Sequence, residues 1–158
     1  GFKALHLVLF VVIPIYTVGF VAWIIGFLAY GFFAGIVLSV VFQLAHTVSE
    51  THFPETNPST GKVEDEWAVH QLKTTANFAT KSKFWSWFTG GLNFQVEHHL
   101  FPNICHVHYP AVSEIVKQTC EEFNVPYLEN PTFFSALKSH VKAIISFGKL
   151  PNINEAIG

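Results

Sequence analysis

Residues 4–49 read ALHLVLFVVIPIYTVGFVAWIIGFLAYGFFAGIVLSVVFQLAHTVS and contain no Asp, Glu, Lys or Arg. The 11 acidic residues all lie beyond this run, as does every lysine except Lys3, and the chain has no arginine. As a single helix rising about 1.5 Å per residue, the run would extend roughly 69 Å, whereas the hydrocarbon core of a bilayer is about 30 Å thick. We therefore expect the run to cross a membrane twice.

The apolar run predicts a transmembrane helical hairpin over residues 1–50. We expect spans at about 3–20 and 26–47, joined by a turn between Val21 and Gly26 beside Trp23, a residue type that favours membrane interfaces. A cleaved signal peptide is excluded because the run is far too long. The alternative is a buried helical hairpin in a soluble protein, but a chain of 158 residues could hardly cover so long a charge-free stretch.

Residues 51–158 are more polar and predict a helical cap, so the expected fold class is all-α. A helix is expected to begin near Trp67, after the acidic residues 64–66, because the helix dipole favours acids at its start. Segments 110–123 and 131–147 have the apolar spacing of amphipathic helices, which we interpret as packing surfaces. The two apolar stripes are Val112, Ile115, Val116 and Cys120, and Phe134, Leu137, Val141 and Ile144.

The distribution of charge places the cap on the cytoplasmic side of the membrane. The lysines beyond the hairpin favour that side by the positive-inside rule, and the aromatic segment 84–88 suits the membrane interface or a place against the hairpin. Nucleic-acid binding is not expected, since the net charge is −2 and there is no basic patch. On a cytoplasmic face Cys105 and Cys120 are not expected to form a disulfide.

The segment Gln95-Val96-Glu97-His98-His99 is the main candidate for chemistry. In a helix, positions 95, 98 and 99 fall within about 100° of arc, so one amide and two imidazoles face the same way. Three metal-capable groups on one face indicate a metal site. For the histidine pair alone, the alternative is two surface residues that are neighbours by chance.

His46 is the second candidate, because it stands at the polar end of the second predicted span. An ionisable residue at membrane depth is costly to desolvate and is by default a functional residue with a partner. Gln43 lies one turn before it and Glu50 one turn after it. Metal coordination is one interpretation of His46, and a hydrogen bond at the membrane interface is the other.

The remaining histidines are weaker candidates. His70 lies four residues after Glu66, so a surface pair on one helix explains it without a metal. His106 and His108 fall in a segment that reads as a loop, where roles facing solvent or substrate are expected. Those expected to be structural or surface residues are His6, His52 and His140.

The candidate ligands, imidazoles and an amide, limit which metals the site could bind. Imidazole and amide ligands suit iron, copper or zinc better than magnesium or calcium. There is no HExxH motif of a zinc metalloprotease and no Glu-x-x-His motif of the carboxylate-rich di-iron bundles. A histidine-rich oxidative iron site remains.

The stretch QVEHHLFP at 95–102, preceded by GGLNF, resembles the third histidine box of membrane fatty-acid desaturases, in the variant with glutamine in place of the first histidine. That variant is typical of front-end enzymes, which insert a double bond between an existing one and the carboxyl end of an acyl chain. The resemblance extends to residues 43–46, 67–78 and 106–127, and the chain is similar to linoleoyl-CoA desaturase-like enzymes.

The resemblance implies an enzyme with two iron ions that uses O2 and two electrons to place a cis double bond in an unsaturated acyl chain linked to CoA or lipid. His98 and His99 would be iron ligands, and His46 would complete the site. Gln95 would be either a weaker iron ligand or a residue that contacts one of the ligand side chains. A ferredoxin or a cytochrome b5 type protein would supply the electrons. Residues that could orient these ligands, or have a less certain place, are Gln43, Glu50, His70, Asn77 and Glu97.

The family also carries two upstream boxes, HxxxH and HxxHH, and neither occurs in this chain. We therefore expect the chain to be the C-terminal part of a longer integral membrane enzyme, inactive by itself, with its metal site on the cytoplasmic side. The alternatives are a di-iron lipid hydroxylase on the same scaffold and a non-enzymatic, membrane-anchored interaction module.

Overall fold

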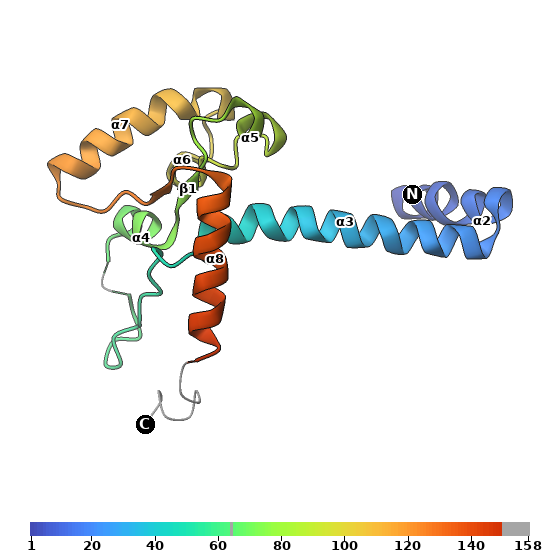
Figure 1. The fold of residues 1–158 in the computed structure, drawn as a ribbon, viewed down its shortest axis with the longest axis horizontal. Coiled ribbons are helices and arrows are strands. Elements are labelled where there is room, and N and C mark those ends of the chain that lie inside the picture. The colour runs from blue at the N-terminus through green and yellow to red at the C-terminus, as the bar shows by residue number, and fades with distance from the viewer. Residues whose placement is uncertain (64, 150–158) are drawn as a thin grey trace. The chain divides into compact units, whose positions relative to one another are not determined.

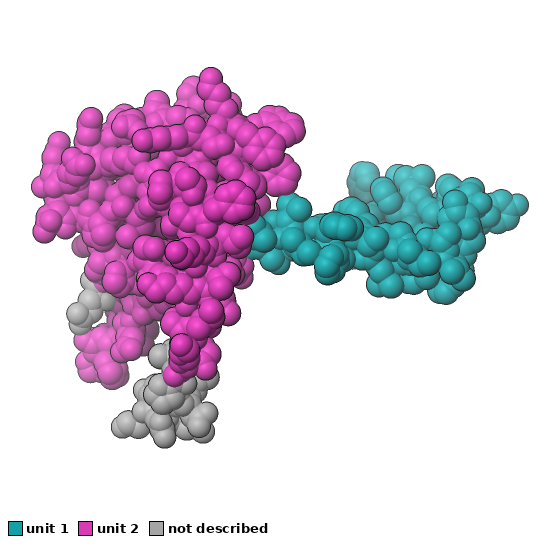
Figure 2. All heavy atoms as spheres, viewed as in Figure 1, with its two compact units in different colours: residues 1–40 teal, residues 41–158 magenta. Residues whose placement is uncertain are grey.

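The computed structural model describes residues 1–63 and 65–149 (Figure 1). Position 64 and residues 150–158, which belong to the predicted cap, lie outside the described residues. The chain forms two compact units, residues 1–40 and residues 41–158 (Figure 2). The helices are α1 (Phe2–Leu7), the π-helical turn η1 (Val8–Val12), α2 (Ile13–Val18), α3 (Phe20–His46), α4 (Trp67–Thr74), α5 (Lys83–Phe88), α6 (Gln95–Leu100), the 3-10 turn η2 (His106–His108), α7 (Tyr109–Glu122) and α8 (Phe133–Phe147).

In the first unit the helix breaks at Gly19, and the predicted turn between Val21 and Gly26 is wrong. Gly19 has φ of 83°, a conformation that glycine adopts at little cost. From Phe20 to His46 the helix α3 continues without a break, because its residues are apolar helix-compatible types and Gly26 keeps a helical conformation.

The helix α3 is long and apolar enough to cross a membrane. Its 27 residues have a mean hydropathy of 2.4 in their most apolar window and extend about 40 Å at 1.5 Å per residue, more than the roughly 30 Å of a bilayer core. Among the described residues α3 is the one helix that is long and apolar enough to cross a bilayer. The apolar helical segment Phe2–Val18 is shorter. The two-span hairpin therefore stays a prediction.

Pro14 and Trp23 explain the irregular helix before the turn. Proline has no N–H, so Pro14 cannot donate to the carbonyl of Phe10, four residues before it. The indole Nε1 of Trp23 donates to that Phe10 oxygen at 2.9 Å. The π-helical turn Val8–Val12 lies where this helical bond is missing.

The second unit is mostly helical but not entirely so. Two short parallel strands, β1 (Asn77–Phe78) and β2 (Glu129–Asn130), pair with Asn77 opposite Glu129 and Phe78 opposite Asn130. The expectation of an all-α fold is corrected here, because a two-residue pairing between distant segments leaves no periodic signal in either segment. A core cluster of the second unit forms from Leu72, Val96, Val116 and Cys120, on the helices α4, α6 and α7.

The predicted helices 110–123 and 131–147 are confirmed as α7 and α8. The residues that these helices bury, however, match the predicted packing surfaces only in part. In α7, Val116 and Cys120 are buried while Ile115 is exposed. In α8 the buried residues are Ala136, Ser139 and Ala143, whereas the stripe interpreted as a packing surface is largely exposed. Cys105 and Cys120 are free thiols.

The turn at Gly90 and Gly91 provides a matched pair of substitutions. Both residues have positive φ, at 62° and 82°. A Cβ at Gly91 would lie 2.6 Å from the Cβ of His106, while a Cβ at Gly90 would meet nothing within 4 Å. We expect Gly90→Ala to cost about 1 kcal/mol of backbone strain, and Gly91→Ala to cost about 2 to 4 kcal/mol because the clash adds to it. Chemical unfolding in detergent measures both; equal costs would contradict the packing of Gly91 on His106.

Candidate metal centre

The four predicted ligand residues, His46, Gln95, His98 and His99, lie close together in the second unit. The ring of His46, at the end of α3, lies 4.9 Å from the ring of His99 in α6, centroid to centroid, and the rings of His98 and His99 are 6.0 Å apart. Gln95 Nε2 lies 3.3 Å from His99 Nε2. Residues that are about fifty positions apart in the sequence therefore form one cluster of imidazoles and an amide.

The neighbouring helices orient the two rings of α6. The Nδ1 of His99 lies 2.7 Å from the side-chain oxygen of Gln71 in α4, and because that oxygen can only accept, Nδ1 carries the proton. The lone pair of His99 is then on Nε2, where it faces the side-chain amide of Gln95, and this is the nitrogen that could bind a metal. The Nδ1 of His98 lies 3.2 Å from the hydroxyl of buried Tyr109 in α7.

The sequence alone did not identify Gln71 or Tyr109 as site residues. Gln71 lies within the segment 67–78 that resembles the desaturase family. In that segment the sequence indicates the neighbouring His70, and not Gln71, as a candidate site residue. A search for amides next to candidate histidines would have found Gln71. Tyr109 had no such signal, because its place depends on how α7 packs against α6.

His99 is a neutral imidazole at physiological pH. Burial, and to a smaller extent the positive charges that His46 and His98 would carry, lowers its pKa to about 4. A neutral imidazole is the form that binds a metal.

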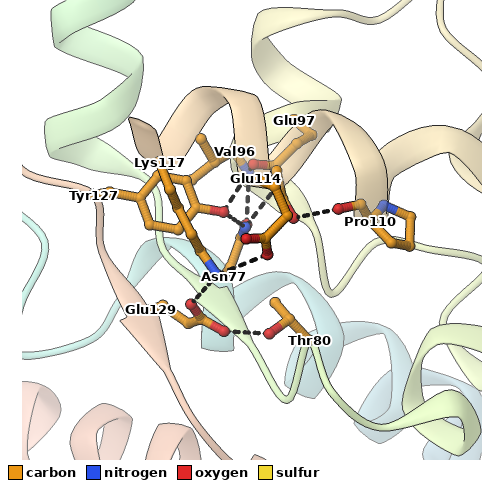
Figure 3. A network of polar contacts seen from close by, with 10 residues as sticks. Asn77, Thr80, Val96, Glu97, Pro110, Glu114, Lys117, Tyr127 and Glu129 are labelled. Carbon is orange, nitrogen blue, oxygen red and sulfur yellow. Dashed lines mark hydrogen bonds and ion pairs between the residues drawn. The ribbon is translucent and has the colours of Figure 1, made fainter. Parts of the chain in front are cut away.

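A buried polar network holds α6 in place (Figure 3). Asn77 Nδ2 donates to Glu97 Oε2 at 2.7 Å and to the Tyr127 hydroxyl at 2.6 Å, and that hydroxyl donates to Glu97 Oε1 at 2.8 Å. Asn77 Oδ1 accepts from the backbone N–H of Val96 at 2.8 Å. Asn77 thus bonds the backbone of Val96 and the side chain of Glu97, the two residues that precede His98.

Glu97 is fully buried, with 0% of its surface exposed. Burial raises its pKa, and the hydrogen bonds from Asn77 and Tyr127 oppose that rise without cancelling it. Burial and the Glu97 charge also raise the pKa of Tyr127, which therefore stays a hydrogen-bond donor. The carboxylate of Glu97 bonds no histidine among the described residues, so the expected orienting role of Glu97 is indirect.

An ion pair closes the outer side of this network (Figure 3). Lys117 Nζ lies 2.9 Å from Glu129 Oε2, and Thr80 donates to the other Glu129 oxygen. Burial by itself would raise the pKa of Glu129, but the hydrogen bonds from Thr80 and Lys117 and the Lys117 charge outweigh it, so the pKa lies below its ordinary value.

The other predicted residues lie outside the imidazole cluster. Glu50 accepts a hydrogen bond from Ser139 in α8. The Gln43 side chain accepts from Thr47 at 2.6 Å on an exposed side of the helix. The Nδ1 of His70 is buried and has no hydrogen-bond partner within the described part of the chain.

Three of the histidines outside the predicted site are either exposed or make a structural contact. His106 and His108 are exposed, and His140 Nδ1 donates to the backbone oxygen of Thr47 at 2.6 Å, a structural contact.

The cluster fits part of an imidazole-bound metal site. The Nδ1 atoms of His98 and His99 already have partners, as in metal-binding histidines, and their Nε2 atoms are the ones that could bind a metal. In residues 1–63 and 65–149, however, no group of three or more His, Cys, Asp or Glu side chains is arranged to hold a metal ion.

Comparison with known proteins places these residues in context. Residues 2–131 match the family model described as fatty acid desaturase. The chain is 50% identical over 115 residues to the sn-1 linoleoyl-lipid 6-desaturase of Synechocystis, covering 73% of this chain and 32% of that protein. It is 52% identical over 106 residues to the acyl-lipid (8-3)-desaturase of Physcomitrium patens, covering 67% of this chain and 22% of that protein.

A more distant relative covers almost the whole chain. The probable Delta(5) fatty acid desaturase C of Dictyostelium discoideum is 34% identical over 154 residues, or 95% of this chain and 34% of that protein. The chain thus spans about a third of the length of such relatives or less. No solved structure matches the chain.

The Lys117–Glu129 pair predicts a pH-dependent loss of stability in Lys117→Gln. Because the folded pKa of Glu129 is lowered, its ionised form contributes stability above the ordinary glutamate pKa of about 4.3, and that stability is lost as the pH falls through the folded pKa. We expect Lys117→Gln to lower the free energy of unfolding by about 1 kcal/mol at pH 7, with the difference closing toward about pH 3.

Chemical unfolding in detergent across this pH range measures the effect. Lys138→Gln is the control, since Lys138 is exposed and has no ion-pair partner among the described residues. An equal loss for Lys117→Gln at pH 7 and at pH 3 would show that the lysine acts through packing and not through Glu129.

Proposed function

Because the chain belongs to the fatty acid desaturase family, we propose that it is the C-terminal part of a membrane-bound di-iron desaturase of the front-end type. The observation that carries this proposal is the contact of the His46 ring with the ring of His99, which lies beside His98, at the end of a helix able to span a membrane. The metal site and the cap would lie on the cytoplasmic side, which the lysines beyond α3 support.

His46, His98 and His99 would hold iron, with Gln95 as a weaker ligand, and histidines outside these residues would supply the remaining ligands. Bound iron would supply activation of O2 with two external electrons and removal of two hydrogens from adjacent methylenes, leaving a cis double bond. A site built from imidazoles suits this oxidative chemistry.

The residues of this chain would position the ligands. Gln71 holds the proton of His99 on Nδ1 and so presents Nε2, while Tyr109 fixes the ring of His98. The bonds from Asn77 and Tyr127 to Glu97 hold the helix on which both histidines stand. The rings of His98 and His99 are thus already oriented before any metal binds, which lowers the free-energy cost of assembling the site.

The substrate would be an unsaturated fatty acyl chain. Both a CoA ester and a lipid-linked chain fit the family, and the names of the Synechocystis and Physcomitrium relatives, which act on acyl lipids, favour the lipid-linked form. A ferredoxin or a cytochrome b5 type protein would be the electron donor.

We expect the double substitution His98→Ala with His99→Ala, made in the full-length protein, to abolish desaturation and lower the iron content per chain. The matched control is His108→Ala, an exposed histidine outside the cluster that should leave both unchanged. Iron is measured by elemental analysis and the product by mass spectrometry, where a hydroxylated chain in place of a double bond would identify a hydroxylase. Iron and desaturation that survive the double substitution would contradict the proposal.

We expect Gln71→Leu in the full-length protein to weaken iron binding by about 10- to 100-fold, because the ring of His99 loses the acceptor that sets its tautomer. Gln71→Glu keeps an acceptor oxygen and should retain more of the affinity. Titration of bound iron with a competing chelator measures the effect, with Gln118→Leu on the exposed side of α7 as the control. Unchanged affinity in Gln71→Leu would remove Gln71 from the site.

A further inference from the structure

The helix α8 turns its large apolar side chains away from the protein. Its buried residues are the small Ala136, Ser139 and Ala143. On the opposite side Phe134, Val141 and Ile145 are 78%, 49% and 53% exposed. At 100° per residue these three fall within about 40° of arc, so they form one continuous outward strip. A helix that merely packed on the cap would have the reverse arrangement.

The middle of α8 is bonded to the residues that directly follow α3. Ser139 Oγ accepts from the backbone N–H of Ser49 at 2.8 Å, and the Ser139 carbonyl accepts from the Ser49 hydroxyl at 3.0 Å. His140 Nδ1 donates to the carbonyl of Thr47 at 2.6 Å. Since α3 ends at His46, these bonds hold α8 within three residues of the end of the candidate span.

The outward apolar surface continues from α8 onto α5. Trp85 of α5 stacks on Phe133, the first residue of α8, with ring centroids 4.0 Å apart and planes 9° apart. On the same short helix, Phe84 and Trp87 are 58% and 77% exposed. Figure 1 shows α5 close to the N-terminal end of α8. Tryptophan beside other large apolar groups is typical of the membrane–water interface.

Lysines border the apolar strip of α8. Lys138 and Lys142 are exposed and lie about 40° and 80° around the helix from Phe134. Their aliphatic stems can lie along an apolar surface while the ammonium groups reach the lipid headgroups. An apolar strip with lysine at its edge is the pattern of a helix that lies in the plane of the interface.

We propose that α8 and α5 lie in the headgroup region of the bilayer and turn an interfacial patch, formed by Phe84, Trp87, Phe134, Val141 and Ile145, toward lipid. The inference rests on the proposed insertion of α3 in the membrane. Three residues of chain cover about 5 to 10 Å, which matches the roughly 5 to 8 Å of interfacial region on each side of the hydrocarbon core. Lipid is therefore the surface within reach of this patch.

The test uses the full-length protein in nanodiscs of phosphatidylcholine and phosphatidylglycerol, in a variant without other reactive cysteines. An environment-sensitive fluorophore is attached at Val141→Cys and, separately, at Ile145→Cys. Gln118→Cys, exposed on α7, is the aqueous control, and Leu28→Cys in α3 reports the membrane insertion itself. Each label is quenched in turn by lipid with a nitroxide near the headgroup and by iodide in the buffer.

The proposal predicts that nitroxide lipid quenches the labels at positions 141 and 145 several-fold more than the label at 118, and that iodide shows the opposite order. Quenching by iodide as strong as at 118 would overturn it, because the patch would then face water. Protection from both quenchers would also overturn it, because another protein segment or a second copy would then cover the patch. A label at position 28 that iodide quenches freely would instead refute the membrane insertion on which the proposal rests.

Discussion

A carboxylate that is fully buried must be hydrogen-bonded, and this requirement at Glu97 organises the second unit. Its two oxygens are bonded by Asn77 from β1 and by Tyr127 from the segment before β2. Asn77 also accepts from the backbone of Val96. Hydrogen-bonding this one side chain thus joins three distant stretches of chain, and two histidines of the candidate centre, His98 and His99, follow directly after it. Their position therefore depends on a network in which neither takes part.

The two histidines of α6 have neutral hydrogen-bond partners. A carboxylate bonded to a ligand histidine would add negative charge near the metal and raise the basicity of the ring. Here the Nδ1 atoms of His99 and His98 meet the amide of Gln71 and the hydroxyl of Tyr109. These partners orient the rings without adding charge.

The sequence predicted the apolar helix that ends at His46, the face shared by Gln95, His98 and His99, and the two amphipathic helices of the cap, because each has a local pattern of polarity. It misplaced the break in the apolar run, since several glycines could have made that turn and only Gly19 adopts a positive φ there. The pairing of β1 with β2 and the roles of Gln71 and Tyr109 could not be predicted. They arise from contacts between segments far apart in the chain, which no local pattern records.

We propose that His46, His98 and His99 bind iron together with histidines from the rest of the protein. The most direct measurement is a high-resolution structure of the full-length protein loaded with iron, with the metal located by its anomalous scattering. We expect iron within coordination distance of all three imidazoles, with Gln71 and Tyr109 still bonded to the Nδ1 atoms of His99 and His98. Iron bound entirely by other residues, with His98 and His99 turned away from it, would show that these histidines are not ligands.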